Sequence, residues 1–289
     1  MKAEIEVLQP GLYTSIQDLG RYGFQKFGVP QSGVMDRYAM RICNLILGNP
    51  QEKSVMEITM QGPQLKFNSP TSVCISGADL SPKLNGQAVS NNEIINLKKN
   101  DIIEFGKRKS GFRSYLGISG GFETEKVMES LSWYEGLTDQ FRLEKGMKLA
   151  CSADSFSNSE TYSSLKIDSE YISSNAIGVY PGPEFEFLTN TQKNQLFNAD
   201  FNTDEKSNRM AVQVKEELQN DLQPIITAPV MPGTVQLTPS GKIIILMRDC
   251  QTTGGYPRIL QLSEYGIQVL SQKLPGDKIK FLKKNYPEF

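Results

Sequence analysis

A glycine-rich string near the C-terminus brings polar side chains together directly after a hydrophobic strand. The string Asp249-Cys-Gln-Thr-Thr-Gly-Gly-Tyr-Pro257 follows the apolar run of residues 243–247. Its hydroxyl and amide groups, its flexible glycine pair and its aromatic ring suit a neutral planar polar ligand such as an amide, a urea or a lactam. We therefore predict ligand-binding roles for Gln251, Thr252, Thr253, Gly254, Gly255 and Tyr256. A wide hairpin whose threonines bind their own backbone has equal weight on composition alone.

Asp249 is the carboxylate of this string that is best placed to orient or deprotonate a ligand, because it lies where a buried strand reaches the surface. It is the predicted catalytic residue. A structural salt bridge with Arg248 or Arg258 is the alternative interpretation.

A second glycine-rich motif lies near the N-terminus, from Ile16 to Asp36. Arg21 suits two-point binding of a carboxylate or phosphate, and the helix that opens at Asp36 offers free N–H groups to an anion. The predicted ligand-binding residues here are Arg21, Ser32 and Asp36, with Arg21 and Asp36 flanking a groove. On spacing alone a structural loop is favoured, because the motif is neither a P-loop nor a dinucleotide fingerprint. A weaker candidate, Arg209, suits an ion pair with a core carboxylate.

The composition excludes several classes of site. The 289 residues include no histidine, so Ser-His-Asp and Cys-His nucleophilic sites are excluded and the commonest metal ligand is missing. The four cysteines are scattered singly, which favours buried, inert thiols and no metal site. A formal net charge of -1 gives no attraction to nucleic acid or an anionic membrane. The N-terminus lacks a signal-peptide pattern, so we expect a cytoplasmic protein.

Short β-patterned runs separated by turn residues dominate the chain, which favours a mainly β fold built as a sandwich or barrel. Three amphipathic helices are predicted, beginning at Asp36, at Thr189 or Asn190, and at Ser263. The chain becomes serine-rich in the middle. We therefore predict an N-terminal domain of residues 1–155, a C-terminal domain of residues 176–289, and a linker of residues 156–175.

Taken together, these motifs resemble the C-subunit family of the biotin-dependent carboxyltransferases, also called the allophanate hydrolase subunit 2 family. The N-terminal motif resembles Gln-Asp-x-Gly-Arg-x-Gly…Gly-Val-Pro-x-Ser-Gly-x-Met-Asp of that family. Further matches are Asn44, Gly48-Asn49-Pro50, Glu57, Gly62-Pro63, Gly77-Ala78-Asp79-Leu80, Ser119-Gly120-Gly121, Asp249 and Gln251-Thr-Thr-Gly-Gly-Tyr-Pro257. The chain departs from the family at Leu131, where an arginine is usual, and at Ala211, where a glycine is usual.

The resemblance implies two cyclophilin-like β-barrel domains with a few short helices. It implies a role as the C subunit of an ATP-dependent 5-oxoprolinase, which converts pyroglutamate, ATP and water to glutamate, ADP and phosphate. The implied partners are a B subunit of the allophanate hydrolase subunit 1 type and an A subunit, and ATP is the implied cofactor of the assembled complex. We expect the chain to be inactive alone.

Two other branches of the family define the alternatives. One is the carboxyltransferase part of a biotin-dependent urea carboxylase and allophanate hydrolase system, in which biotin would be carried by another protein. The other is a non-catalytic regulator that binds a protein similar to the B subunit, as an antagonist of a kinase inhibitor does.

Overall fold

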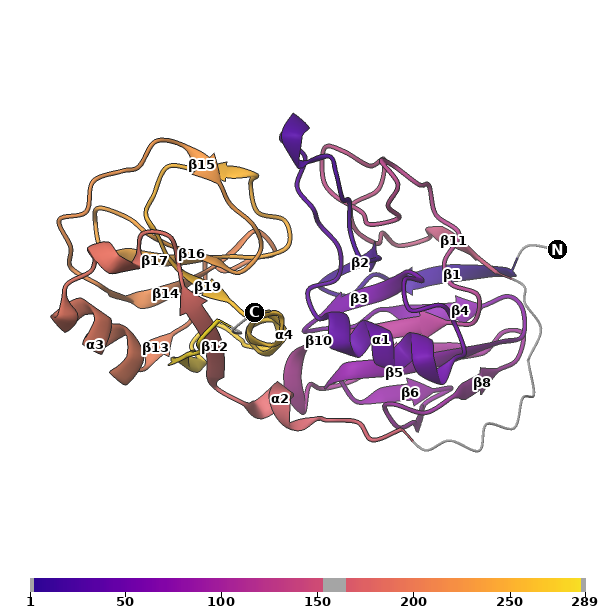
Figure 1. The fold of residues 1–289 in the computed structure, drawn as a ribbon. Helices are drawn as coiled ribbons and strands as arrows, with labels where there is room; N and C mark the ends of the chain where they lie inside the picture. Colours follow the sequence, from indigo (N-terminus) through magenta and orange to yellow (C-terminus); the bar gives the residue numbers. More distant parts are fainter. Residues whose placement is uncertain (1–2, 153–164, 287–289) are drawn as a thin grey trace. The chain divides into compact units, whose positions relative to one another are not determined.

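The computed structural model describes residues 3–152 and 165–286 of the chain. It is mainly β, with four short α-helices in those described ranges, which confirms the predicted fold class (Figure 1). The chain divides into two compact units. The first unit comprises Met1–Gly20 and Asp36–Ser173, and the second comprises Arg21–Met35 and Ser174–Phe289.

This division differs from the predicted domain boundaries in two places. The segment Arg21–Met35, here called the strap, belongs to the second unit although it lies within the predicted N-terminal domain. The first unit continues to Ser173 and includes the helix α2, Glu170–Ser173, which the prediction placed in a linker. Residues 156–164 of that linker lie outside the described residues. The strap groups with the second unit because its partners there lie about two hundred residues later in the sequence, and the predicted domain boundaries remain a prediction.

The first unit contains two antiparallel sheets. The larger has the order β11-β1-β4-β9-β6-β7 and the smaller β2-β3-β10-β5-β8. The larger sheet consists of β11 Lys148–Cys151, β1 Ala3–Gln9, β4 Gln64–Phe67, β9 Ile102–Phe105, β6 Pro82–Leu84 and β7 Gln87–Ala88. The smaller consists of β2 Tyr13–Gln17, β3 Val55–Thr59, β10 Ser110–Ile118, β5 Thr71–Asp79 and β8 Ile95–Leu97. Alternate side chains such as Ile5, Leu65 and Ile103 are fully buried, so the two sheets enclose one hydrophobic core.

Helix α1, Arg37–Ile46, packs against β5 and β10 in this unit (Figure 1). A Cβ atom at Gly117 would lie 2.9 Å from the Cβ of Cys43, so a glycine in β10 permits this close approach.

The second unit contains a seven-stranded sheet that is nearly closed into a barrel. Its order is β13-β20-β12-β19-β16-β17-β14, and a β-bridge between Thr203 and Val214 joins the chain after β13 to β14 at the opposite edge. The strands are β13 Phe201–Asn202, β20 Lys278–Lys283, β12 Ala176–Pro181, β19 Arg258–Leu262, β16 Thr234–Leu237, β17 Lys242–Leu246 and β14 Ala211–Glu217. A separate pair consists of β15 Ala228–Pro229 and β18 Thr253–Gly254. Closure of this kind leaves few unpaired backbone groups at the edges.

The three predicted helices are confirmed. They could be predicted because each N-cap side chain binds a backbone N–H group close to it in the sequence. Asp36 caps α1, Thr189 forms a capping box with Gln192 at α3, Asn190–Asn198, and Ser263 caps α4, Glu264–Ser271. Helix α4 packs against β12, and α3 packs against β20. Two single 3₁₀ turns, Gln25–Phe27 and Phe185–Phe187, complete the described helical segments.

Candidate functional site

Three of the sequence motifs meet around the carboxylate of Asp249 in the second unit. Arg209 Nε donates to Oδ2 of Asp249 at 2.8 Å, and its Nη2 donates to Oδ1 at 3.1 Å. Ser32 Oγ donates to the same Oδ1 at 2.7 Å. Ser32 is fully buried, and Arg209 and Asp249 are 8% and 9% exposed. The three side chains therefore form one shielded cluster, here called the clamp.

Backbone contacts explain why these distant residues come together. Asp249 N donates to Arg209 O at 3.0 Å, and Ser32 N donates to Arg248 O at 2.9 Å. Arg209 Nη2 also donates to Gly33 O at 2.7 Å. Ser32 has a positive φ of 59°, an uncommon conformation for a residue other than glycine. The clamp thus fastens the strap to the end of β17.

The clamp corrects the predicted salt bridges of Asp249. Its partner is Arg209, which confirms the interpretation of Arg209 as an ion-pair partner of a core carboxylate. Arg248 instead pairs with Glu264, and Arg258 pairs with Glu184 at 2.8 Å. Both oxygens of Asp249 already accept hydrogen bonds within the unit. This geometry favours a positioning role over that of a general base.

Backbone hydrogen bonds hold the loop that follows the clamp, and its polar side chains do not take part in them. Thr253 and Gly254 pair with β15, and Ile225 N donates to Gly255 O at 2.9 Å. Among the residues that the structure describes, the side chains of Gln251, Thr252 and Thr253 have no hydrogen-bonding partner. The threonine hydroxyls therefore do not bind the described backbone, and all three side chains are at least partly exposed to solvent.

The two glycines of the loop have different environments. A Cβ atom at Gly254 would collide with the side-chain amide of Gln236, so the absence of a side chain there serves internal packing. At Gly255 the nearest atom to a Cβ would be Ile225 O at 3.7 Å, which leaves room on that side. Close approach of a ligand to the backbone remains a prediction, with Gly255 the less crowded position. Tyr256 is 40% exposed beside it.

The remaining predicted residues, Arg21 and Asp36, belong to different units. Arg21 lies in the strap and is fully buried, with its backbone N donating to Gln31 O at 2.6 Å. Asp36 begins the second segment of the first unit and is also fully buried. The groove that these two residues were predicted to flank remains a prediction.

Asp36 belongs to a buried hydrogen-bond network in the first unit. Its Oδ1 accepts from Ala39 N at 3.0 Å, and its Oδ2 accepts from the hydroxyl of Tyr171 at 2.7 Å. The hydroxyl of Tyr115 accepts from Asp36 N at 2.9 Å and donates to Glu57 Oε2 at 3.0 Å. Burial, together with the nearby carboxylates, raises the pKa of both tyrosines, so the phenols remain protonated donors at neutral pH.

Sequence reasoning missed a second carboxylate centre at Asp18. Its Oδ1 accepts from Ser130 Oγ and Ser132 Oγ, each at 2.6 Å, and its Oδ2 accepts from Leu131 N at 2.7 Å. Gly20 N donates to Oδ1 at 2.8 Å as well. These contacts join the N-terminal motif to the string at residues 129–134. The two serines that flank Leu131 could be seen in the sequence as possible hydrogen-bond donors. No residue near them in the sequence indicated that Asp18 is their partner.

Comparison with known proteins identifies the family. The model of the carboxyltransferase domain, subdomain A and B, matches residues 27–283 of this chain. The chain belongs to this carboxyltransferase-domain family. Among its relatives, the C subunit of 5-oxoprolinase from Escherichia coli is 28% identical over 285 residues, covering 96% of this chain and 90% of that protein.

Other members of the carboxyltransferase-domain family are parts of larger chains. Urea amidolyase of Saccharomyces cerevisiae is 39% identical over 131 residues, covering 45% of this chain and 7% of that protein. The crystal structure of Kluyveromyces lactis urea carboxylase matches with a TM-score of 0.87 at 28% identity, covering 98% of this chain. This carboxyltransferase-domain chain spans 27% of that urea carboxylase chain.

In this carboxyltransferase-domain protein, no group of three or more His, Cys, Asp or Glu residues within the described ranges is arranged to hold a metal ion. No helix in the same described ranges has the length and hydropathy needed to span a membrane.

All four cysteines are buried and unpaired, which confirms the expectation of buried thiols. Burial raises the pKa of Cys151 to about 11 and that of Cys250 to about 12, and it also raises the pKa of Cys43.

At pH 8 we expect only about one part in a thousand of a thiol with such a pKa to be thiolate, or less. The native protein should therefore react very slowly with Ellman's reagent, and four thiols should react after denaturation. Rapid labelling of a thiol in the folded protein would contradict this expectation.

Proposed function

We propose that this chain is the C subunit of an ATP-dependent 5-oxoprolinase and acts together with its B and A subunits. The observation that supports this most strongly is the end-to-end similarity to the C subunit of 5-oxoprolinase, which covers 96% of this chain and 90% of the relative. The substrate would be 5-oxoproline, a lactam that ATP activates for hydrolysis to glutamate in the assembled complex. The chain alone would have no turnover.

The loop of residues 251–257 is the proposed substrate-facing element. A lactam presents an N–H donor beside a C=O acceptor. Hydroxyl and amide side chains can match both groups, and those of Gln251, Thr252 and Thr253 have no partner among the described residues. Tyr256 offers a partly exposed ring that could cover one face of the substrate. In this proposal Asp249 holds the loop in place through the clamp, and the proton-transfer groups lie on the partner proteins.

Replacing Thr253 with valine tests the loop, because it removes one hydroxyl from an exposed side chain and preserves its shape. We expect turnover of the complete complex to fall by about two- to tenfold, which corresponds to the loss of one neutral hydrogen bond. Thermal stability and assembly with the B subunit should not change. Thr191→Val is the matched control, because Thr191 is an exposed threonine on α3 of the same unit. If both variants react like the wild type, the loop is structural and does not contact the substrate.

Reconstitution with candidate A and B subunits tests the assignment itself. We expect glutamate to form from 5-oxoproline only when all three proteins and ATP are present. The strong structural match to urea carboxylase supports one competing function, transfer of a carboxyl group from biotin to urea. Urea-dependent turnover that requires a biotinylated carrier protein would favour that alternative. Tight binding to the B subunit without any effect on turnover would favour a purely regulatory protein.

A further inference from the structure

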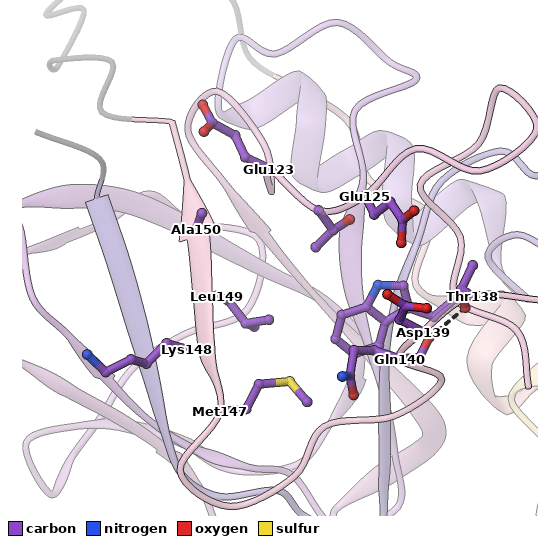
Figure 2. Close-up of a pocket in the computed structure, with 11 residues that line it drawn as sticks. Glu123, Glu125, Thr138, Asp139, Gln140, Met147, Lys148, Leu149 and Ala150 are labelled. Atoms are coloured by element: carbon purple, nitrogen blue, oxygen red, sulfur yellow. Dashed lines mark hydrogen bonds between the residues drawn. The ribbon is translucent and has the colours of Figure 1, made fainter.

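The first unit contains a pocket of about 300 Å³ beside β11 (Figure 2). The exposed carboxylates of this pocket do not face one point, because that of Glu123 is directed away from Glu125 and Asp139 (Figure 2). In the second unit, by contrast, one buried polar side chain lies directly against the loop of residues 251–257. This side chain is Gln236 on β16, which belongs to none of the glycine-rich motifs.

Gln236 lies on the face of β16 that the loop covers. Val235 and Leu237 on either side of it are fully buried, and successive side chains of a strand point to opposite faces, so Gln236 points away from these two. It is nevertheless only 2% exposed. Its Nε2 donates to Tyr256 O at 3.4 Å, and a Cβ atom at Gly254 would lie 2.4 Å from the same nitrogen. The loop therefore covers the Gln236 side chain.

A β-bulge helps to bring the loop to this position. The pairing of β16 with β19 shifts register between Val235 and Gln236, so Ile259 is an extra residue on β19. Leu237 N donates to Pro257 O at 3.0 Å, which continues the pairing into the end of the loop. Bulges redirect a strand and are frequent beside functional sites. The end of the loop is thus fixed to the backbone of β16, and Gln236 contacts the residues just before it.

The side-chain amide and the glycine fit each other. Burial of a carboxamide costs free energy that burial of a methionine side chain of similar length does not, and the bond to Tyr256 O offsets part of this cost. Gly254 is not among the glycines with positive φ, so its backbone suits alanine as well. Val230 Cγ1 would lie 3.3 Å from a Cβ atom there, which requires only a small shift. The amide of Gln236 is therefore the main obstacle to a side chain at Gly254.

We propose that Gln236 is the positioning residue of the substrate-facing loop. Its carboxamide sets the distance between β16 and residues 254–256, and the missing side chain of Gly254 permits this close approach. The exposed side chains of Thr253 and Tyr256, on either side of the contact, are thereby held in fixed places for a ligand. The effect of Gln236 on turnover rests on the proposed function, whereas its hold on the loop can be measured in the chain alone.

Two backbone amides report on the loop in the isolated chain. Ile225 N donates to Gly255 O at 2.9 Å, and Val230 N donates to Thr252 O at 3.0 Å. Both amides should exchange their hydrogens faster when the loop opens more often. Hydrogen exchange followed by mass spectrometry of peptides that cover residues 224–231 therefore measures how firmly the loop is held.

Three single variants use this measurement. Gln236→Met keeps the length of the side chain and removes the donor, and Gly254→Ala displaces the amide. Each should speed exchange of the two amides by about two- to tenfold, the effect of one weak hydrogen bond. Gly255→Ala is the control for exchange, because the atom nearest to its Cβ would be 3.7 Å away. It should exchange like the wild type.

A double variant separates the contact from a general loss of stability. In Gln236→Ala the amide that opposes a side chain at Gly254 is gone. Adding Gly254→Ala to this variant should therefore speed exchange by less than about twofold, although the same change in the wild type has the larger effect. Fully additive effects would show that the amide and the glycine do not act on each other.

Turnover of the assembled complex tests the positioning role. Gln236→Met should raise the KM for 5-oxoproline by about three- to tenfold and leave kcat within about twofold, because misplaced binding groups weaken substrate binding. A partly unfolded enzyme would instead lose kcat at an unchanged KM. The KM for ATP should not change. Gln195→Met is the matched control, since Gln195 Nε2 on α3 also donates to a backbone oxygen, that of Glu217, at 3.4 Å.

The outcomes separate this role from the proposed function. If the wild-type complex does not turn over 5-oxoproline, the proposed function is wrong, and exchange alone decides whether Gln236 holds the loop. Faster exchange in Gln236→Met at an unchanged KM would show that Gln236 is structural only. Wild-type exchange in Gln236→Met would overturn the positioning role altogether.

Discussion

Replacing Arg209 with alanine is expected to lower the free energy of unfolding of the second unit by about 3–5 kcal/mol, because it leaves a buried carboxylate without its counter-ion. Asp249 is only 9% exposed, and without Arg209 its sole side-chain donor in the clamp is Ser32. The carbonyl oxygen of Gly33 would lose the guanidinium donor as well. The strap should loosen first, because two of the contacts that fasten it depend on this cluster.

Hydrogen exchange followed by mass spectrometry measures this effect locally. Peptides that cover Arg21–Met35 and the chain around Asp249 should exchange faster in Arg209→Ala, whereas peptides from β3 and β10 of the first unit should not. Lys193→Ala is the control, since Lys193 pairs at 2.6 Å with Glu186, whose side chain is 80% exposed, and such a pair contributes little. Unchanged exchange in the strap, with normal stability, would show that the clamp does not hold it.

The same experiment separates the two interpretations of Asp249. Asp249→Asn keeps the shape of the side chain and weakens its bonds to Arg209. If Asp249 positions the loop, turnover of the complex should fall only as far as the strap and loop become more mobile. A large loss of turnover with wild-type exchange in both segments would instead support the predicted catalytic role.

The parts of the fold that depend on near neighbours could be predicted from the sequence. Asp36, Thr189 and Ser263 each cap a helix whose first backbone N–H groups lie three residues further along. Capping therefore leaves a signal within one helical turn. Short runs rich in apolar residues and bounded by turn residues likewise identified strands such as β3 and β17, because this signal lies within the strand itself.

The partners of the motif residues could not be predicted, because they are set by contacts between segments far apart in the sequence, such as the pairing of β14 with β17. Asp249 has Arg248 beside it in sequence, yet it pairs with a residue forty positions earlier. Neighbouring side chains point in different directions here, since Arg248 pairs with Glu264. The backbone bond from Asp249 N to Arg209 O decides the pairing, and only the folded sheet provides it. Ser32 lies 217 residues from Asp249 and has no local signal at all.

The family resemblance identified the right strings but not their roles. Asp18 lies in the matching N-terminal motif, whereas Leu131 marks a departure from the family. The structure joins the two strings through three hydrogen bonds, from Ser130 Oγ, Leu131 N and Ser132 Oγ to the carboxylate of Asp18. Leu131 contributes its backbone N–H to this centre, which any residue can supply. The departure from arginine at Leu131 therefore leaves this carboxylate centre intact.

The second large effect is expected at Asp36, whose carboxylate has two structural tasks. One oxygen caps α1 through Ala39 N, and the other accepts the hydroxyl of Tyr171, which is 3% exposed. Loss of an N-cap costs about 1 kcal/mol, and loss of a hydrogen bond to a charged group costs about 1.5–3 kcal/mol. Asp36→Ala should therefore destabilise the first unit by about 2–4 kcal/mol.

A double-mutant cycle with Tyr171→Phe separates the two tasks. The phenylalanine has no hydroxyl to leave unsatisfied, so the double variant should be less destabilised than the sum of the single variants, by about 1–2 kcal/mol. Ser263→Ala serves as the control for a cap alone, because Ser263 Oγ accepts only from Gly266 N at 3.0 Å in the same kind of position. Urea denaturation followed by the fluorescence of Trp133 reports on the first unit, where both Asp36 and Tyr171 lie, and far-UV circular dichroism also follows the second unit, where the control residue Ser263 lies. If Asp36→Ala unfolded at the wild-type urea concentration yet abolished turnover of the assembled complex, Asp36 would act on a ligand as its motif first suggested. Simple additivity of the two substitutions would show that the bond between Asp36 and Tyr171 contributes no stability.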